Sequence, residues 1–197
     1  MAESRSGFDR LASFAERWGG FAAPVGADRF VEFEASFGFT FPEDLAWLYG
    51  LGDGGPMAGD VWLRLDDVFV IKAKWDRDLA SVGDPCVLDY GIVSVDGRVQ
   101  ASFWRRGWIP FVSSNGMLAG LAVDCDPGPG GRVGQVITFG DQDDTKYVVA
   151  ESVPTLIDAV AGLVDKYGDA AVDPHDGYPL VVDGDSVPLR SALRRYG

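Results

Sequence analysis

The chain has 197 residues, of which 47% are hydrophobic and 12% aromatic, so it holds enough apolar material for the core of one domain and is not expected to be disordered. Its formal net charge of −13 argues against binding to nucleic acid or to anionic membranes, and no apolar run is long enough to cross a bilayer. An acidic surface attracts basic partners, although in many proteins it serves only solubility. The amino terminus lacks the basic and apolar regions of a secretory signal, which predicts a cytoplasmic protein.

Helices are expected to open the chain. Residues 6–20 place apolar side chains at helical spacing and end at a glycine pair, and residues 27–38 form a second helix that Gly38 terminates. A third helix starts at Pro42, whose fixed φ suits a first helical position, and the two acidic residues after it favour the positive end of the helix dipole. The Asp-Gly-Gly sequence at residues 53–55 then forces a turn.

The middle of the chain is expected to consist mainly of strands. Residues 61–65 alternate as a strand does, which places Val61 on one face with the two leucines. Residues 98–114 look like two strands that meet near Gly107. Residues 66–83 fit either a strand or a short helix, and we favour the helix.

Residues 116–127 alternate again, and the two faces of this predicted strand differ in polarity. One face carries Met117, Ala119, Leu121, Val123 and Cys125. Asp124 and Asp126 point the other way. Residues 133–140 and 145–151 form two more strands, and the acidic turn 141–144 joins them as a hairpin linker.

The pattern of the last helix is regular over residues 152–168, with apolar side chains at i, i+3, i+4 and i+7 throughout. Ser152 can cap its start and Gly168 its end, and the helix should lie flat against the sheet. Residues 169–197 are rich in Pro, Gly and Asp, with a short strand at 179–182 and a final helical turn at 189–197.

This order of elements predicts an α+β fold, in which amino-terminal helices precede a mainly antiparallel sheet packed against a carboxy-terminal amphipathic helix. We expect residues 1–168 to form the domain and residues 169–197 to be an extension packed on it.

The glycine-rich segment 126–134 invites comparison with a phosphate-binding loop. It lacks the lysine that such a loop places on the phosphates, and a predicted strand follows it where a helix is needed. The segment is therefore interpreted as a turn between two antiparallel strands.

A metal site is one interpretation of Asp124 and Asp126, which share one side of the predicted strand. Calcium needs more oxygen ligands than these two supply, and Pro127 interrupts the EF-hand pattern. The structural alternative is that Asp126 starts a turn while Asp124 faces solvent or pairs with a neighbour such as Arg132. Cys86 and Cys125 form no metal-binding pair, and Cys125 fits a small core position.

Catalytic sets are also not apparent. His175, the one histidine of the chain, lies in a predicted loop without a nucleophile motif, and carboxylates of the acidic turns cannot be paired across a cleft from sequence. We expect no catalytic residue, no metal and no cofactor, and therefore no enzyme.

Four segments in order resemble the SUKH superfamily, over roughly residues 25 to 168. They read FVEFEASFGFTFPEDLAWLYGLGDGG, GWIPFVSSNG, AVDCDPGPGGRVGQVI and VVAESVPTLIDAV. Asp53 stands where the family usually has Asn. The family-signature positions, interpreted as structural, are filled by Glu34, Pro42, Gly54, Gly55, Trp108, Pro110, Phe111, Pro127, Gly134 and Gln135.

The resemblance implies an α+β fold with helices flanking the sheet, and members that are mostly not enzymes. Bacterial members are thought to act as immunity proteins that bind and neutralise a polymorphic toxin, often a nuclease. A fungal branch regulates cell-wall assembly and links it to growth signalling. The abundance of Gly, Ala and Asp with few Lys suits a GC-rich bacterium, which favours the immunity function.

The leading hypothesis is thus a cytoplasmic immunity protein whose acidic face occludes a basic toxin domain. The residues expected to contact the partner are Asp53, Asp124, Asp126, Asp141, Asp143 and Asp144. The alternative is a regulatory scaffold in cell-wall assembly or signalling. The oligomeric state and the identity of the partner are left open by the sequence.

Overall fold

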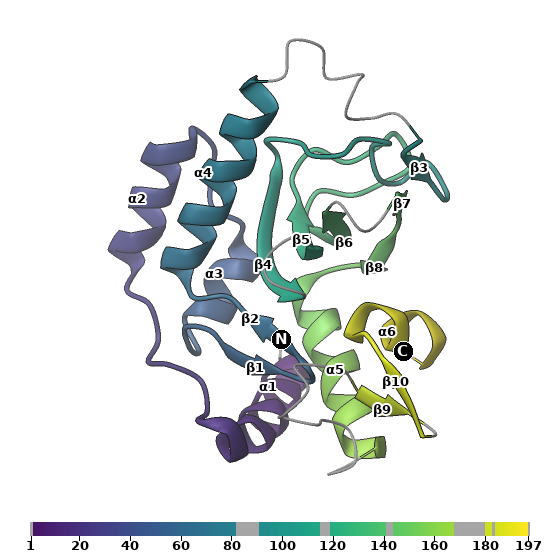
Figure 1. Ribbon diagram of the computed structural model, residues 1–197. Coiled ribbons are helices and arrows are strands. Elements are labelled where there is room, and N and C mark those ends of the chain that lie inside the picture. Colours follow the sequence, from purple (N-terminus) through teal and green to yellow (C-terminus); the bar gives the residue numbers. More distant parts are fainter. Residues whose placement is uncertain are drawn as a thin grey trace.

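The structure is a computed structural model, and it describes residues 2–81, 91–114, 119–140, 144–167, 180–182 and 184–196. Its helices are α1 (Ala2–Ala15), the 3-10 turn η1 (Glu16–Trp18), α2 (Ala27–Phe37), α3 (Glu43–Tyr49), α4 (Leu65–Ser81), α5 (Val153–Tyr167) and α6 (Leu189–Tyr196). Its strands are β1 (Gly55–Met57), β2 (Asp60–Trp62), β3 (Val93–Ser94), β4 (Trp108–Ser114), β5 (Ala119–Asp124), β6 (Gln135–Gly140), β7 (Thr145–Lys146), β8 (Val148–Ala150), β9 (Leu180–Val182) and β10 (Asp185–Val187). Figure 1 shows their arrangement.

The main sheet is antiparallel throughout, with the strand order β1-β2-β4-β5-β6-β8 among the described residues. Every residue of β5 and β6 is buried, so both faces of its centre are covered. Helix α4 packs on β4, while α5 contacts β6 and β8 and is itself covered by α1 and α3 (Figure 1). The predicted α+β fold, with a carboxy-terminal helix against a mainly antiparallel sheet, is confirmed.

The predicted helices form because their apolar stripes and their end signals agree. Gly19 and Gly38 adopt left-handed conformations directly after η1 and α2, as expected of glycines that end helices. Ser152 Oγ accepts a hydrogen bond of 3.3 Å from the Thr155 backbone N–H at the start of α5. The helix favoured for residues 66–83 is α4, and the glycine-rich segment does join two antiparallel strands, β5 and β6. Gly168 lies outside the described residues.

Two predictions about strands are wrong. Residues 98–107 form a loop, and only β4 is a strand in the segment 98–114. The Arg98 carbonyl accepts a hydrogen bond of 2.9 Å from the Gly128 N–H, so it pairs with the glycine-rich loop and not with a neighbouring strand. On β2, Val61 is 53% exposed whereas Trp62 is buried. The alternation ends there because α4 begins at Leu65, and the helical turn brings that leucine into the core.

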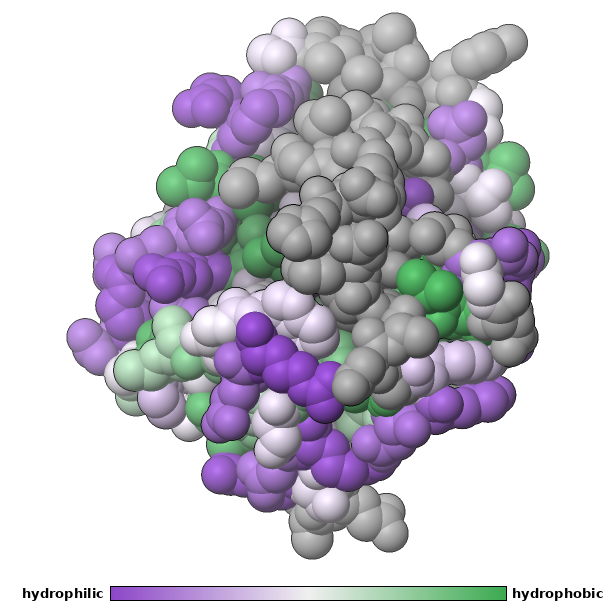
Figure 2. Space-filling view, turned by 60° about the horizontal axis from the view of Figure 1, so that its bottom comes forward, coloured by the Kyte–Doolittle hydropathy of each residue, from purple (hydrophilic) through white to green (hydrophobic). Residues whose placement is uncertain are grey.

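Apolar side chains are concentrated in the interior. Trp62 contacts the rings of Phe8, Phe21 and Tyr49, with centroid distances of 5.1–6.4 Å. Figure 2 shows that hydrophilic side chains cover most of the described surface on one face, where apolar residues form small separate patches. The aromatic residues therefore serve mainly as core, and the surface is left to charged groups.

The carboxy-terminal residues contact the rest of the molecule through α6, which packs on α5, β8 and β9. These contacts support the proposal that residues 169–197 belong to the same domain as residues 1–168.

A second link from α6 is electrostatic. Asp60 on β2 accepts a hydrogen bond of 2.8 Å from Ser114 Oγ on β4. Burial raises the pKa of Asp60 to about 6, while the Ser114 hydrogen bond and the positive charge of Arg190 on α6 act in the opposite direction.

We predict that Trp62→Ala lowers the free energy of unfolding by about 3–5 kcal/mol, because it empties a fully packed aromatic site. Val61→Ala, one residue away on the exposed side of β2, should change it by less than about 0.5 kcal/mol. Urea denaturation of both variants measures the difference. Equal costs at the two positions would contradict the observed orientation of β2.

We also predict a pH dependence from Asp60. Its raised pKa means that the unfolded chain releases this proton more readily, so its contribution favours folding below about pH 4 and is lost as the pH rises through about 6. Asp60→Asn keeps an acceptor for Ser114 and removes the titration. The stability of this variant relative to the wild type should rise by about 1–3 kcal/mol between about pH 4 and about pH 7.5. A difference that stays constant in urea denaturation across this range would contradict the assignment.

Candidate functional site

The centre of the candidate site is a polar pair buried between the two middle strands. Asp124 on β5 and Gln135 on β6 are register partners, and both side chains are fully buried. Asp124 Oδ2 accepts a hydrogen bond of 2.9 Å from Gln135 Nε2, and Oδ1 accepts one of 2.9 Å from the backbone N–H of Asp126. Burial raises the pKa of the Asp124 carboxyl, and these two hydrogen bonds oppose that shift.

The same glutamine fixes a neighbouring loop. Gln135 Nε2 also donates to the Arg98 carbonyl at 2.9 Å, and Gln100 Nε2 donates to the Pro127 carbonyl at 3.0 Å. Glycines in the β5–β6 loop allow this close approach. A Cβ at Gly131 would lie 2.1 Å from the Arg98 carbonyl oxygen, and one at Gly128 would lie 2.3 Å from that of Gly97. The glycine-rich segment is thus shaped by backbone packing against residues 97–100.

The Arg98 side chain borders a pocket of about 270 Å³, which we call the β8 pocket. It is lined by the three residues of β8, by Glu151, by Thr155 and Ala159 of α5, and by Leu193 of α6, together with Arg98. Arg98 Nη2 contacts both carboxylate oxygens of Glu151, at 2.7 and 2.8 Å. Arg132 Nη1 lies 3.6 Å from the same carboxylate. The buried pair therefore positions the loop whose arginine forms one wall of an open apolar pocket.

The acidic residues expected to contact a partner do not form one exposed face. Asp124 is buried, and it pairs with Gln135 rather than facing solvent or Arg132, so it presents no carboxylate to a partner. Asp53 Oδ1 accepts a hydrogen bond of 2.7 Å from Leu65 N–H, at the start of α4.

Other members of that set have different surroundings. Asp126 Oδ2 accepts a hydrogen bond of 2.6 Å from Arg105 Nε. Asp144 is exposed. Asp141 and Asp143 lie outside the described residues.

Signature positions in the amino-terminal half hold turns. Glu34 Oε1 accepts a hydrogen bond of 2.9 Å from Phe41 N–H, which ties the end of α2 to the approach to α3. Helix α3 begins at Glu43, one residue later than predicted, so Pro42 is its N-cap and not its first helical residue. Gly54 has a φ of 74°, and a Cβ there would lie 2.7 Å from the Arg64 backbone nitrogen. Gly55 is equally confined, because its Cβ would lie 2.7 Å from the Gly20 carbonyl oxygen.

Signature positions in β4 and β6 shape the sheet. Pro110 lies at the register shift of β4 against β5, where a residue without an N–H is tolerated. Trp108 and Phe111 are fully buried, and the Phe111 carbonyl accepts a hydrogen bond of 2.9 Å from Leu63 N–H. Gly134 has a φ of 91°, and its N–H donates to the Asp124 carbonyl at 2.8 Å.

A buried lysine on α4 is a feature that the sequence analysis missed. Lys72 Nζ donates to the Arg106 carbonyl at 2.6 Å and to Asp76 Oδ2 at 3.0 Å. It also lies 5.0 and 5.2 Å from the ring centroids of Phe37 and Phe39. Burial lowers the pKa of Lys72, and the Asp76 carboxylate acts against this shift. The spacing of Lys72 and Asp76, four residues apart, is the only signal, and it is typical of exposed helix pairs as well.

Within the described ranges, no group of three or more His, Cys, Asp or Glu residues could hold a metal ion, and no helix is long and apolar enough to cross a membrane. Cys125 is partly buried, and burial raises the pKa of its thiol to about 11, so the reactive thiolate is scarce at neutral pH. His175 and Cys86 fall outside the described residues.

The buried pair yields a stability prediction. Gln135→Leu keeps the approximate size of the side chain but removes the amide donor from the buried Asp124 carboxyl, which should cost about 2–3 kcal/mol at neutral pH. Gln100→Leu removes a neutral hydrogen bond in the same region and should cost about 1 kcal/mol. Urea denaturation measures both. A cost for Gln135→Leu no greater than that for Gln100→Leu would show that the carboxylate does not depend on the glutamine.

Comparison with curated proteins finds fungal relatives. The chain is 46% identical over 142 residues to "Cell wall biosynthesis/cell cycle regulator smi1" of Schizosaccharomyces pombe, covering 62% of this chain and 27% of that protein. It is 37% identical over 82 residues to "Cell wall assembly regulator SMI1" of Saccharomyces cerevisiae, covering 41% and 16%. It is 46% identical over 63 residues to "Glucan synthesis regulatory protein" of Neurospora crassa, covering 32% and 12%. The chain thus spans 27% or less of the length of these relatives.

These relatives correct the leading functional hypothesis. They carry the names of fungal regulators of cell-wall assembly and glucan synthesis, so the expectation of a bacterial immunity protein that neutralises a toxin is wrong. The choice of the bacterial branch over the fungal one followed residue usage, which reflects the base composition of a genome and not the protein's partner.

The family is established by a match over most of the chain. Residues 24–159 match the family model described as "SMI1 / KNR4 family (SUKH-1)". This range includes α2 to β8 and the first part of α5, and therefore the buried pair, the glycine-rich loop and most of the β8 pocket. The resemblance to the SUKH superfamily is confirmed, and the chain belongs to the SMI1/KNR4 family (SUKH-1).

Proposed function

We propose that this chain is a non-enzymatic protein-binding module that regulates cell-wall assembly. The observation that carries the proposal is the family match over residues 24–159, together with relatives named as regulators of cell-wall assembly and glucan synthesis. Because the chain spans a small share of those proteins, the proposal concerns the matched domain and its contacts, and not their whole activity.

The surroundings of the buried residues support a binding role over a catalytic one. Asp124, which is fully buried, already accepts hydrogen bonds from Gln135 and Asp126, and these two bonds fix the loop that follows β5. Lys72 is likewise held by Asp76 and by the Arg106 carbonyl. These buried polar groups form hydrogen bonds inside the domain, so we expect contacts with other molecules to be made by surface residues.

Replacement of the matched domain in a relative tests the proposal. In Schizosaccharomyces pombe, the segment of the smi1 regulator aligned with this chain is exchanged for residues 1–197. We expect the chimera to restore most of the growth that a strain without the regulator loses on a dye that perturbs the cell wall. Growth rate and glucan content of the wall are the measurements.

The matched control is the same regulator with the aligned segment deleted and nothing inserted. The deleted form should restore much less growth than the chimera. The proposal fails if the chimera accumulates to the wild-type level and still does not restore growth. It also fails if the deleted form works as well as the chimera, since the domain would then contribute nothing to wall assembly.

A further inference from the structure

We propose that the β8 pocket binds an extended, acidic segment of a partner protein, with one apolar side chain inserted into the pocket. This inference rests on the proposed protein-binding function and names the chemistry of its partner. The floor of the pocket is apolar, formed by Val148 and Val149 of β8, Ala159 of α5 and Leu193 of α6. A volume of about 270 Å³ is smaller than the usual site for a drug-sized ligand and suits a single large side chain.

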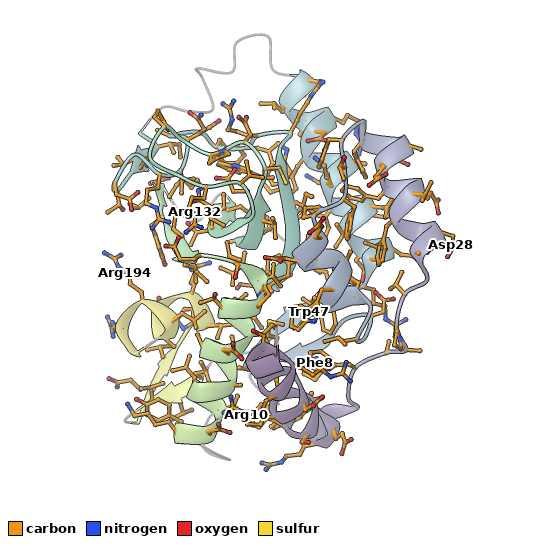
Figure 3. All side chains as sticks on the ribbon, turned by 180° about the vertical axis from the view of Figure 1, so that it is seen from behind. Phe8, Arg10, Asp28, Trp47, Arg132 and Arg194 are labelled. Atoms are coloured by element: carbon orange, nitrogen blue, oxygen red, sulfur yellow. The ribbon has the colours of Figure 1, made fainter. Side chains whose placement is uncertain are left out.

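The charge around this pocket is opposite to that of the whole chain. Arg98 lines it, Arg132 reaches the Glu151 carboxylate beside it, and Arg194 lies over the Tyr147 ring at 5.1 Å, next to Val148. Figure 3 shows Arg132 and Arg194 on the same side of the molecule. Glu151 is the acidic residue among those that line the pocket, and the guanidinium groups of Arg98 and Arg132 both contact its carboxylate.

This local excess of positive charge selects an anionic partner. Arg132 is 74% exposed, so its guanidinium can bind a second carboxylate without leaving Glu151. Arginine presents several N–H donors in a planar fork, which suits paired recognition of carboxylates. In a chain with a net charge of −13, such a cluster stands out against a surface that repels acidic molecules elsewhere.

The extended form of the partner follows from the sheet. Within the part of the chain that the structure describes, β8 is the last strand in the order β1-β2-β4-β5-β6-β8, and it pairs with β6 on one side. The pocket lies along all three residues of β8. A peptide in extended conformation can lie beside an edge strand, form main-chain hydrogen bonds with it and direct alternate side chains into a neighbouring pocket.

The test uses a display library of random peptides of about ten residues, selected on the full chain. We expect the enriched peptides to be acidic and to share one large apolar residue. A fluorescein-labelled peptide from this selection then serves as the probe for fluorescence anisotropy against variants of the chain.

The decisive comparison is between two double variants that have the same net charge as each other. The double variant Arg132→Glu with Arg194→Glu reverses two charges beside the pocket. The control, Arg5→Glu with Lys74→Glu, reverses two exposed charges on α1 and α4, outside the residues that line it. We expect the first to raise the Kd of the acidic peptide by about tenfold or more, and the second by less than about threefold.

A third variant tests the apolar part. Ala159→Leu adds volume at the floor of the pocket, and leucine is a good helix former at this position on α5. This variant should raise the Kd of the parent peptide by about tenfold. The Kd of a peptide with alanine at the apolar position should rise by no more than about twofold. Circular dichroism of each variant confirms that the fold is retained.

Three outcomes would overturn the inference. These are enriched peptides that are not acidic, equal weakening by the two charge-reversal variants, or a single-stranded oligonucleotide that binds the pocket more tightly than the peptides. The outcome for the proposed function is separate. If the chimera in fission yeast restores growth equally well with Arg132→Glu and Arg194→Glu in place, the regulatory function stands and the β8 pocket is not its contact.

Discussion

The hydrogen bond between Asp124 and Gln135 is the interaction on which the described site depends. A carboxylate without exposed surface is costly unless donors are supplied, and here one donor comes from the neighbouring strand and one from the chain that follows. The same amide also holds the Arg98 carbonyl, so the sheet, the glycine-rich loop and the loop before β4 meet at one side chain. A single glutamine thereby connects the core to the edge where Arg98 and Glu151 are displayed.

Helix α4 shows a comparable use of a charged residue in the interior. Lys72 joins α4 to the loop before β4 through the Arg106 carbonyl, and it is enclosed by the rings of Phe37 and Phe39. Cation–π contacts and hydrogen bonds together compensate part of the cost of burying an ammonium group. Two loops that flank β4 and β5 are thus fixed by buried polar groups and not by apolar packing alone.

Sequence reasoning succeeded where structure is decided locally. The stripe of α5 and the glycines that end η1 and α2 are signals contained in a few neighbouring residues, and the corresponding elements were placed within a few positions. The order of helices and strands then sufficed for the α+β class. The resemblance to the SUKH superfamily also came from residues close in sequence, since each motif is a short segment.

The structure differs from the sequence-based predictions where contacts between distant segments decide the conformation. Alternation along residues 98–107 suggests a strand, but contacts with residues 127–135 make that segment a loop. For Asp124 on β5 the sequence predicts exposure to solvent or a pair with a neighbour such as Arg132, whereas its partner is Gln135 on the adjacent strand and the side chain is buried. The β8 pocket draws its walls from Arg98, β8, α5 and Leu193, which no sequence pattern places together.

Both edges of the main sheet are very short. Among the described strands, β1 and β8 have three residues each, whereas the central strands β5 and β6 have six residues each. A three-residue edge offers few main-chain hydrogen bonds, which protects the protein against uncontrolled growth of the sheet through other chains. It also limits how long any strand laid beside it is retained, because residence time falls with the number of bonds that must break together. Main-chain contacts made at a three-residue edge are therefore readily exchanged.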